Sequence, residues 1–149
     1  MRIMGLDFGD KTVGVALTDE LLMTAQPLET ICRERWNKFR KTLKRLDEII
    51  SEYNVEKIVI GKPLNMDDTE GERIERTRIF EEELRKRTGL EIIEVDERLT
   101  TVEADEILDE MGVPRLERKQ YIDKIAATII LESYLRCGKA KRITKKEKI

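Results

Sequence analysis

Acidic residues occur at three places in or beside segments that would not normally carry a buried charge. Asp7 lies within an apolar, strand-like segment, and Asp123 lies near the start of an apolar helical segment. Asp96 and Glu97 directly follow the strand-like residues 92–95. A buried carboxylate is costly unless it is paired or binds a metal ion. Carboxylates that converge on one place repel one another, and a divalent cation such as Mg²⁺ removes that repulsion.

Metal-dependent hydrolysis is the chemistry that such a set of acids could carry. Two divalent ions held by shared carboxylates can activate water and stabilise the leaving oxygen of a phosphodiester. The chain has no histidine, which excludes Ser-His-Asp and Cys-His nucleophile arrangements and His-based zinc sites. Its two cysteines cannot form a thiolate cage, and neither common nucleotide-binding fingerprint is present. Taken alone, each acid could be structural: Asp7 could cap a turn, and Asp123 could pair with Lys119.

The elements that must position these acids follow from hydrophobic periodicity. Alternating apolar residues predict strands over residues 2–8, 13–18, 28–31, 57–61 and 91–95. Helical spacing predicts helices over residues 35–53, 69–88, 100–111 and 117–137, which end at Asn54, Gly89, Gly112 and Gly138. This order predicts an α/β fold, with a mixed central sheet of about five strands and helices on both faces.

Small residues lie beside two of the acids. Gly5 and Asp7 point to the same face of the first strand, and Gly14 and Ala16 of the paired strand can share that face. Such residues leave a shallow space into which another element fits. Asp123 is followed by alanines three and four positions later, so the last helix can approach a sheet closely beside its own carboxylate.

Of the two adjacent acids, Glu97 is expected to matter more than Asp96. Strand alternation places Glu97 on the face of Ile93 and Val95, which is the more apolar face, whereas Asp96 follows Glu94. The longer glutamate side chain also reaches further from the end of a strand.

Charge is unevenly distributed along the chain. Six cations and one anion fall within residues 139–149, so we expect a domain of residues 1–138 and a basic, mobile C-terminal tail. A basic patch near the first helix could bind backbone phosphates or simply be solvated; it comprises Arg33, Arg35, Lys38, Arg40, Lys41, Lys44 and Arg45. The one tryptophan, three tyrosines and three phenylalanines lie mostly at core spacing, so a stacking platform for single strands is not expected. The longest nearly apolar stretch, residues 125–131, is too short to span a bilayer, so we expect a cytoplasmic protein without a membrane partner.

Four motifs, in this order, resemble the YqgF/RuvX family. They are GLDFGDKTVGVA at residues 5–16, IVIGKPLNMDDT at 58–69, DERLTT at 96–101 and IDKIAA at 122–127. The resemblance covers roughly residues 1–138 and implies an RNase H-like fold and a metal-dependent nuclease. The implied reaction is the 5′-end processing of pre-16S ribosomal RNA. A Holliday junction resolvase acting on branched DNA and a non-catalytic nucleic-acid-binding module are the alternatives.

Carried over by position, the resemblance places the family's acids at Asp7, Glu97 and Asp123, with Asp96 beside Glu97. These side chains would bind Mg²⁺ or Mn²⁺. The candidate contacts to nucleic acid are cations, namely Lys11, Arg35, Arg40, Lys41, Arg98 and Lys119. RNA is the favoured partner and structured DNA is possible, while monomer and dimer both remain open.

The chain departs from the family and from related resolvases at several positions. Lys62 stands where the family usually has leucine. Well-studied resolvases of the same fold carry an acid at the end of the strand that here ends with Gly61. They also carry a second acid on the last helix, where this chain has Ala126 and Ala127. Asp96 or Glu97 must therefore supply the missing ligand.

Overall fold

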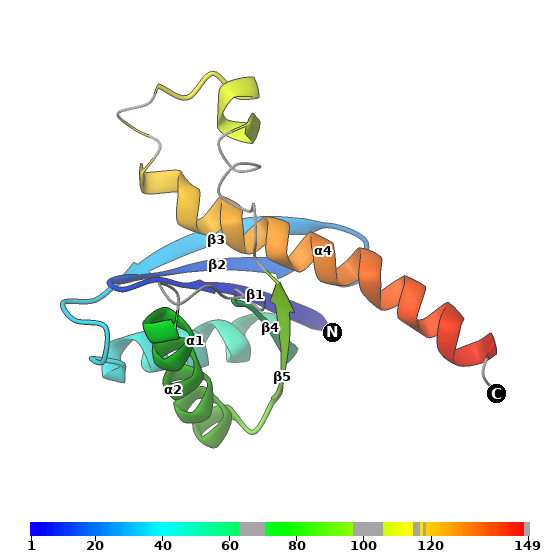
Figure 1. Ribbon diagram of the computed structural model, residues 1–149, viewed down its shortest axis with the longest axis horizontal. Helices are drawn as coiled ribbons and strands as arrows, with labels where there is room; N and C mark the ends of the chain where they lie inside the picture. The colour runs from blue at the N-terminus through cyan, green and yellow to red at the C-terminus, as the bar shows by residue number, and fades with distance from the viewer. Residues whose placement is uncertain (63–70, 97–105, 115–116, 118, 148–149) are drawn as a thin grey trace.

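The structure is a computed structural model that describes residues 1–62, 71–96, 106–114, 117 and 119–147. Its centre is a five-stranded sheet with the strand order β3-β2-β1-β4-β5 (Figure 1). The strands are β1 (Arg2–Phe8), β2 (Thr12–Thr18), β3 (Ala25–Cys32), β4 (Val55–Lys62) and β5 (Glu91–Asp96). β2 is antiparallel to both β1 and β3, whereas β1, β4 and β5 run parallel. The sheet is therefore mixed, with β1 at its centre.

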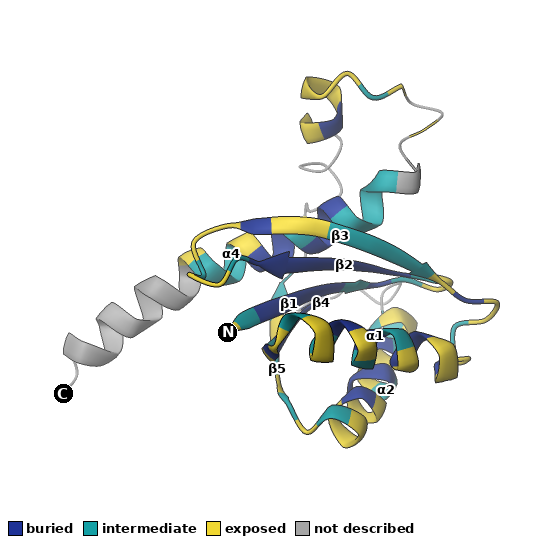
Figure 2. Cartoon of the chain, turned by 180° about the vertical axis from the view of Figure 1, so that it is seen from behind, coloured by how far each residue is buried: buried dark blue, intermediate teal, exposed yellow. Residues whose placement is uncertain are grey.

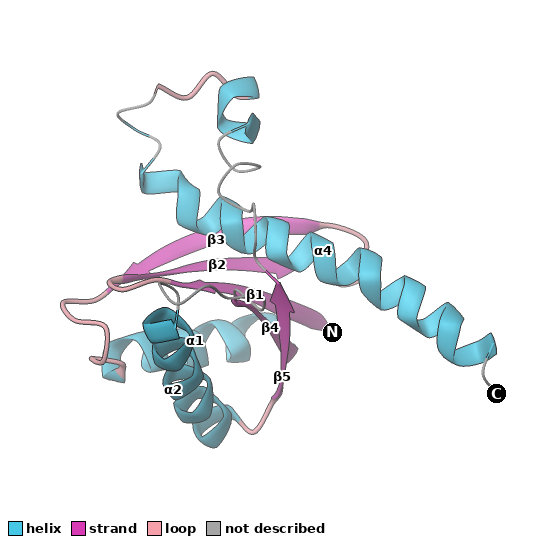
Figure 3. Cartoon of the chain, viewed as in Figure 1, coloured by secondary structure: helices cyan, strands magenta, loops and turns pink. Residues whose placement is uncertain are grey.

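Helices cover both faces of this sheet (Figure 3). α1 (Arg40–Tyr53) and α2 (Gly71–Thr88) lie against one face, and α4 (Lys119–Glu147) crosses the other (Figure 1). The core between the sheet and the first two helices includes Met4, Leu6, Phe8, Leu46, Ile58 and Phe80. A second core lies beneath α4 and includes Ile3, Ala16, Val59, Ala127, Ile130 and Leu131. β1 and β2, which are enclosed by these two layers, are buried over most of their length (Figure 2).

The first half of α4 is the part that packs on the sheet. Six of the seven residues 125–131 are buried, as expected of a segment that is apolar on every side. The short helical segment 106–110 adds Leu108, which packs against Ile125 and Ile129 of α4. None of the helices in the described part of the chain has the length and apolarity that a membrane span requires.

The predicted fold class is confirmed: the sheet is mixed, has five strands and carries helices on both faces. Three of the predicted helix ends are also confirmed. Asn54 adopts a left-handed conformation with φ of 54° and donates its N–H to the carbonyl of Ile50. Gly89 and Gly112 have φ of 69° and 74°. Glycine adopts this region at little cost, which explains why the helices stop there.

Other predicted boundaries are wrong for identifiable reasons. β3 begins at Ala25 and includes Pro27, because it is an edge strand with an irregular register opposite Val15 and Ala16, where proline is tolerated. α1 begins only at Arg40, although the apolar spacing continues back to residue 36. α4 continues through Gly138 to Glu147, because a helix-interior glycine costs only about 1 kcal/mol. The division into residues 1–138 and a basic tail at 139–149 stays a prediction.

Candidate active site

Asp7 lies near the end of the central strand β1 and points to the face that α4 covers. Gly5, two residues earlier, faces α4 directly, since a Cβ atom built on it would lie 2.9 Å from the carbonyl oxygen of Ala127. Side chains of a strand alternate, so Asp7 shares the face of Gly5. The Asp7 side chain is only 13% exposed. A carboxylate thus lies largely buried between the sheet and a helix.

α4 touches the sheet beside Asp7. Gly14 of β2 is the cross-strand partner of Asp7. A Cβ atom on Gly14 would lie 1.9 Å from the backbone carbonyl oxygen of Asp123, so only glycine allows this approach. The backbone of Asp123 therefore lies against the strand pair that carries Asp7. The predicted role of small residues, which is to let the last helix approach the sheet beside its own carboxylate, is confirmed.

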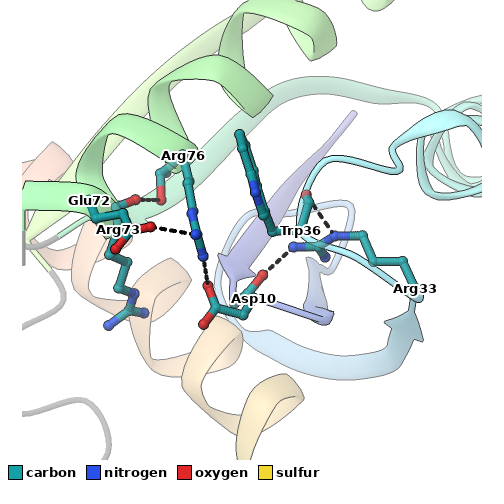
Figure 4. Close-up of polar contacts among 8 residues, drawn as sticks. Asp10, Arg33, Trp36, Glu72, Arg73 and Arg76 are labelled. Atoms are coloured by element: carbon teal, nitrogen blue, oxygen red, sulfur yellow. Dashed lines mark hydrogen bonds and ion pairs between the residues drawn. The ribbon is translucent and has the colours of Figure 1, made fainter.

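Two arginines of α2 contact the same end of β1. The Arg73 guanidinium forms an ion pair with Asp7, with 3.7 Å between Nη2 and Oδ1. One turn later, Arg76 donates to Asp10 in the β1–β2 hairpin at 3.0 Å and also pairs with Glu72 (Figure 4). The sequence analysis missed both arginines, since 66 residues separate Arg76 from Asp10 and no local pattern links them.

The described part of β5 distinguishes the faces of the two adjacent acids. Glu94 lies 3.1 Å from Nζ of Lys62, on the face that α2 covers, and Asp96 follows on that same face. Ile93 and Val95 instead pack into the core beneath α4. Glu97 and Arg98 lie outside the described residues. Within the part of the chain that the structure describes, no three acidic side chains come close enough to hold a metal ion.

Comparison with known proteins assigns the family. A family model described as "RuvX: Holliday junction resolvase" matches residues 1–137. The chain belongs to the RuvX family. Two relatives named "Putative pre-16S rRNA nuclease" are each 57% identical to it over 135 residues. That of Agathobacter rectalis is matched over 91% of this chain and 94% of its own length. That of Lachnospira eligens is matched over 91% and 96%.

The fold of this RuvX-family protein is shared with a solved resolvase. The T. thermophilus RuvC structure in complex with a Holliday junction substrate aligns with a TM-score of 0.55 and 14% sequence identity. The alignment covers 93% of this chain and 96% of that chain. At this level of identity the likeness shows the fold alone, and it confirms the RNase H-like architecture that the resemblance implied.

Lys62, at a position where the resemblance implied leucine, belongs to a buried charged cluster that sequence analysis did not identify. The Lys62 ammonium lies 3.8 Å from Glu81 of α2 as well as 3.1 Å from Glu94 of β5. The Glu81 side chain is only 4% exposed. Burial raises the pKa of Glu81 to about 7; Lys62 lowers it and Glu94 raises it further. This cluster ties α2 to the ends of β4 and β5.

The predicted basic patch separates into structural and exposed cations. Arg33 is buried: it stacks on Phe8 at 4.2 Å and donates to the carbonyls of Gly9 and Trp36. Burial lowers the pKa of Arg33 to about 10, so the guanidinium is still charged at neutral pH. Lys38 and Arg45 also form ion pairs with neighbouring glutamates. Arg33 is therefore part of the core, whereas Lys38 and Arg45 remain partly or largely exposed.

Of the other residues predicted to contact phosphates, four have side chains that the structure describes and two do not. Lys11, Arg35, Arg40 and Lys41 are exposed, and none of them forms an ion pair with another described residue. Lys119 begins α4, but its side chain is not described, and Arg98 lies outside the described residues. Cys32 is exposed at the end of edge strand β3.

Proposed function

We propose that this protein is a metal-dependent nuclease that hydrolyses phosphodiester bonds in the 5′-end processing of pre-16S ribosomal RNA. The observation that carries the proposal is the contact at Gly14, where the backbone of Asp123 meets the strand pair that holds Asp7. Two acids 116 positions apart thereby lie on adjoining elements. A bound divalent cation would offset the cost of bringing carboxylates together between packed elements.

The residues present fit a divalent cation of the Mg²⁺ or Mn²⁺ type. The donors are carboxylates, which these ions prefer, and Asp7 is held in a largely buried position by β1 and α4. Asp7, Glu97 and Asp123 would hold the metal, with Asp96 beside them as a further catalytic candidate. Bound ions of this kind activate water and stabilise the leaving oxygen of a phosphodiester.

The chain's own residues orient these groups and the substrate. Arg73 contacts the Asp7 carboxylate from α2, so it can fix the direction of that side chain. The exposed cations Lys11, Arg35, Arg40 and Lys41 would contact backbone phosphates, together with Arg98, Lys119 and the basic segment 139–149. Phosphate contacts position a nucleic acid without reading its sequence, so these cations alone would not select the substrate.

RNA is the favoured substrate because the relatives at 57% identity are named for pre-16S rRNA. A cytoplasmic location follows from that substrate. The family description, Holliday junction resolvase, supports branched DNA as a second candidate.

A panel of labelled substrates tests the proposal: a pre-16S RNA fragment that spans the mature 5′ end, a four-way DNA junction, and plain RNA and DNA duplexes. Each is incubated with purified protein in Mg²⁺, in Mn²⁺ or in a chelator. We expect cleavage of the RNA precursor that requires metal. Preferred cleavage of the junction would replace RNA processing with resolution. Binding without cleavage in either metal would show a non-catalytic module.

A further inference from the structure

A cavity of about 600 Å³ lies beside the β1–β2 hairpin. Asp10, which lines it, is three residues after Asp7 in the sequence. Its lining comes from the hairpin, from the segment before α1 and from α2; it comprises Asp10, Lys11, Glu34, Arg35, Trp36, Asn37 and Arg76. The volume is within the range of about 300–1,000 Å³ that is typical of small-ligand pockets. Because three residues span at most about 11 Å, the backbone of Asp10 at this cavity lies within about that distance of Asp7.

Trp36 is the only tryptophan of the chain, and it lines this cavity. The Arg76 guanidinium stacks on the indole, with Cζ 4.9 Å from the ring centroid. Phe39 packs edge-on against the ring, with 6.2 Å between the ring centroids. Arg33 donates to the Trp36 carbonyl at 3.1 Å (Figure 4). Trp36 packs against the core and is nevertheless partly exposed. A preorganised aromatic ring that remains partly exposed in a cavity offers a stacking surface at low entropic cost.

The charges of the lining leave two cations uncompensated. Asp10 pairs with Arg76, and Glu34 pairs with Lys38 at 3.2 Å. Lys11 and Arg35 are both exposed, and neither has an ion-pair partner among the residues that the structure describes. The cavity thus combines a partly exposed aromatic ring with two available positive charges.

We infer that this cavity binds one unpaired nucleotide of the substrate strand, with its base against Trp36 and its phosphate near Lys11 and Arg35. Stacking on an aromatic ring needs a base whose face is uncovered, which a base inside a duplex does not have. The inference rests on the proposed function and adds to it that the substrate is single-stranded beside the cleavage site. A stacking platform for single strands was not expected from the sequence, because most aromatic residues lie at core spacing. One partly exposed ring is nevertheless enough to stack one base.

Fluorescence of Trp36 tests the inference directly, because no other tryptophan contributes to the signal. Full-length protein is titrated in a chelator, so that no cleavage occurs, with a six-nucleotide single strand as RNA and as DNA. A blunt duplex of the same sequence and a nucleoside monophosphate are the comparison ligands. We expect saturable quenching by both single strands and much weaker responses to the duplex and the monophosphate.

Variants separate stacking from general attraction. Trp36→Ala should weaken binding of the single strand by about 5- to 150-fold, measured by anisotropy of a labelled strand, whereas Trp36→Phe should keep most of the affinity. The binding constant K of the single strand falls as salt is added, and Lys11→Ala and Arg35→Ala should each make the slope of log K against log salt shallower by about 0.7. Lys86→Ala, which removes an exposed cation from the last turn of α2 away from the cavity, is the matched control and should leave both quenching and affinity unchanged.

Each outcome bears on the inference separately from the proposed function. No quenching by single strands, equal quenching by the duplex, or equal affinity of Trp36→Ala and wild type would overturn the nucleotide subsite. Equally tight binding of the monophosphate would reassign the cavity to a free nucleotide. Loss of metal-dependent cleavage in the substrate panel would refute the nuclease, yet saturable quenching would still establish the cavity as a binding site.

Discussion

Replacing Gly14 by alanine should push α4 away from the sheet where Asp7 and Asp123 meet. The new Cβ atom would lie 1.9 Å from the carbonyl oxygen of Asp123, against a limit of about 3.0 Å that real Cβ contacts respect. The helix backbone must therefore retreat by at least about 1.1 Å, and a backbone atom cannot rotate away as a side chain can. Overpacking of this kind costs about 3 kcal/mol. The expected fall in melting temperature is about 6–12 °C.

The activity of the Gly14→Ala protein should fall further than its stability suggests. A displacement of about 1 Å between reacting groups costs on the order of 100-fold in rate. We therefore expect about 100-fold slower metal-dependent cleavage at a temperature where the variant is still folded. Circular dichroism during urea unfolding measures the stability, and cleavage of a labelled substrate measures the rate.

Two other glycines provide matched controls for this prediction. A Cβ atom on Gly5 would lie 2.9 Å from Ala127 and Leu131, so Gly5→Ala should cost only about 1 kcal/mol. Gly71 opens α2 with nothing within 4 Å, so Gly71→Ala should be neutral or stabilising by up to about 1 kcal/mol. Equal stabilities of Gly14→Ala and Gly71→Ala would refute the contact between α4 and β2, and wild-type activity of Gly14→Ala would refute its role in positioning the acids.

Three further predictions concern other parts of the molecule. Burial raises the pKa of Glu81 from 4.5 to about 7, so its contribution to stability is fully present below about pH 4.5 and is lost as the pH rises through 7. In the wild type, the free energy of unfolding in urea should fall by up to about 3 kcal/mol between about pH 5 and pH 8, and Glu81→Gln should remove this fall. An unchanged pH dependence in Glu81→Gln would exclude the buried carboxyl as its source. Glu97→Ala should lower activity more than Asp96→Ala in a Mg²⁺ titration, because alternation directs Glu97 to the face of Asp7; a larger loss at Asp96 would reverse the assignment. Truncation after Gly138 should flatten the dependence of log K on log salt by at most about 3.5–4.5 while cleavage of bound substrate stays nearly unchanged, and equal slopes would leave residues 139–149 without a role in binding.

Local patterns in the sequence carried most of the fold and the pairing of β1 with α4. Strand alternation placed Asp7 on the face of Gly5, and the alanines after Asp123 indicated a helix that packs closely on the sheet. Both signals come from residues a few positions apart, so they can be read from the sequence alone. The start of α1 was misplaced for a related reason. Trp36 and Phe39 face the core from an irregular segment, where their spacing imitates a helix.

Contacts between distant charged residues could not be predicted in the same way. Arg73 and Arg76 lie on a helix with many exposed charges, and nothing in their spacing indicates that they contact the β1–β2 hairpin. Arg33 stands among exposed cations in the sequence, so its residue type did not indicate that it is buried against Phe8. Lys62 gave the one usable signal, because it departs from the leucine that the resemblance implied. Partners of such residues become visible only when the fold brings them together.

The most direct test of the central claim is the cleavage rate of the Asp7→Asn protein at saturating metal. Asparagine keeps the size of the side chain and removes the charge that a metal requires. The ion pair that is lost is with Arg73, which is 45% exposed, so its loss should cost at most about 1 kcal/mol of stability. We predict no detectable metal-dependent cleavage by a protein that unfolds at nearly the wild-type urea concentration. Wild-type turnover of Asp7→Asn would contradict a metal-binding role for Asp7 and with it the proposed mechanism.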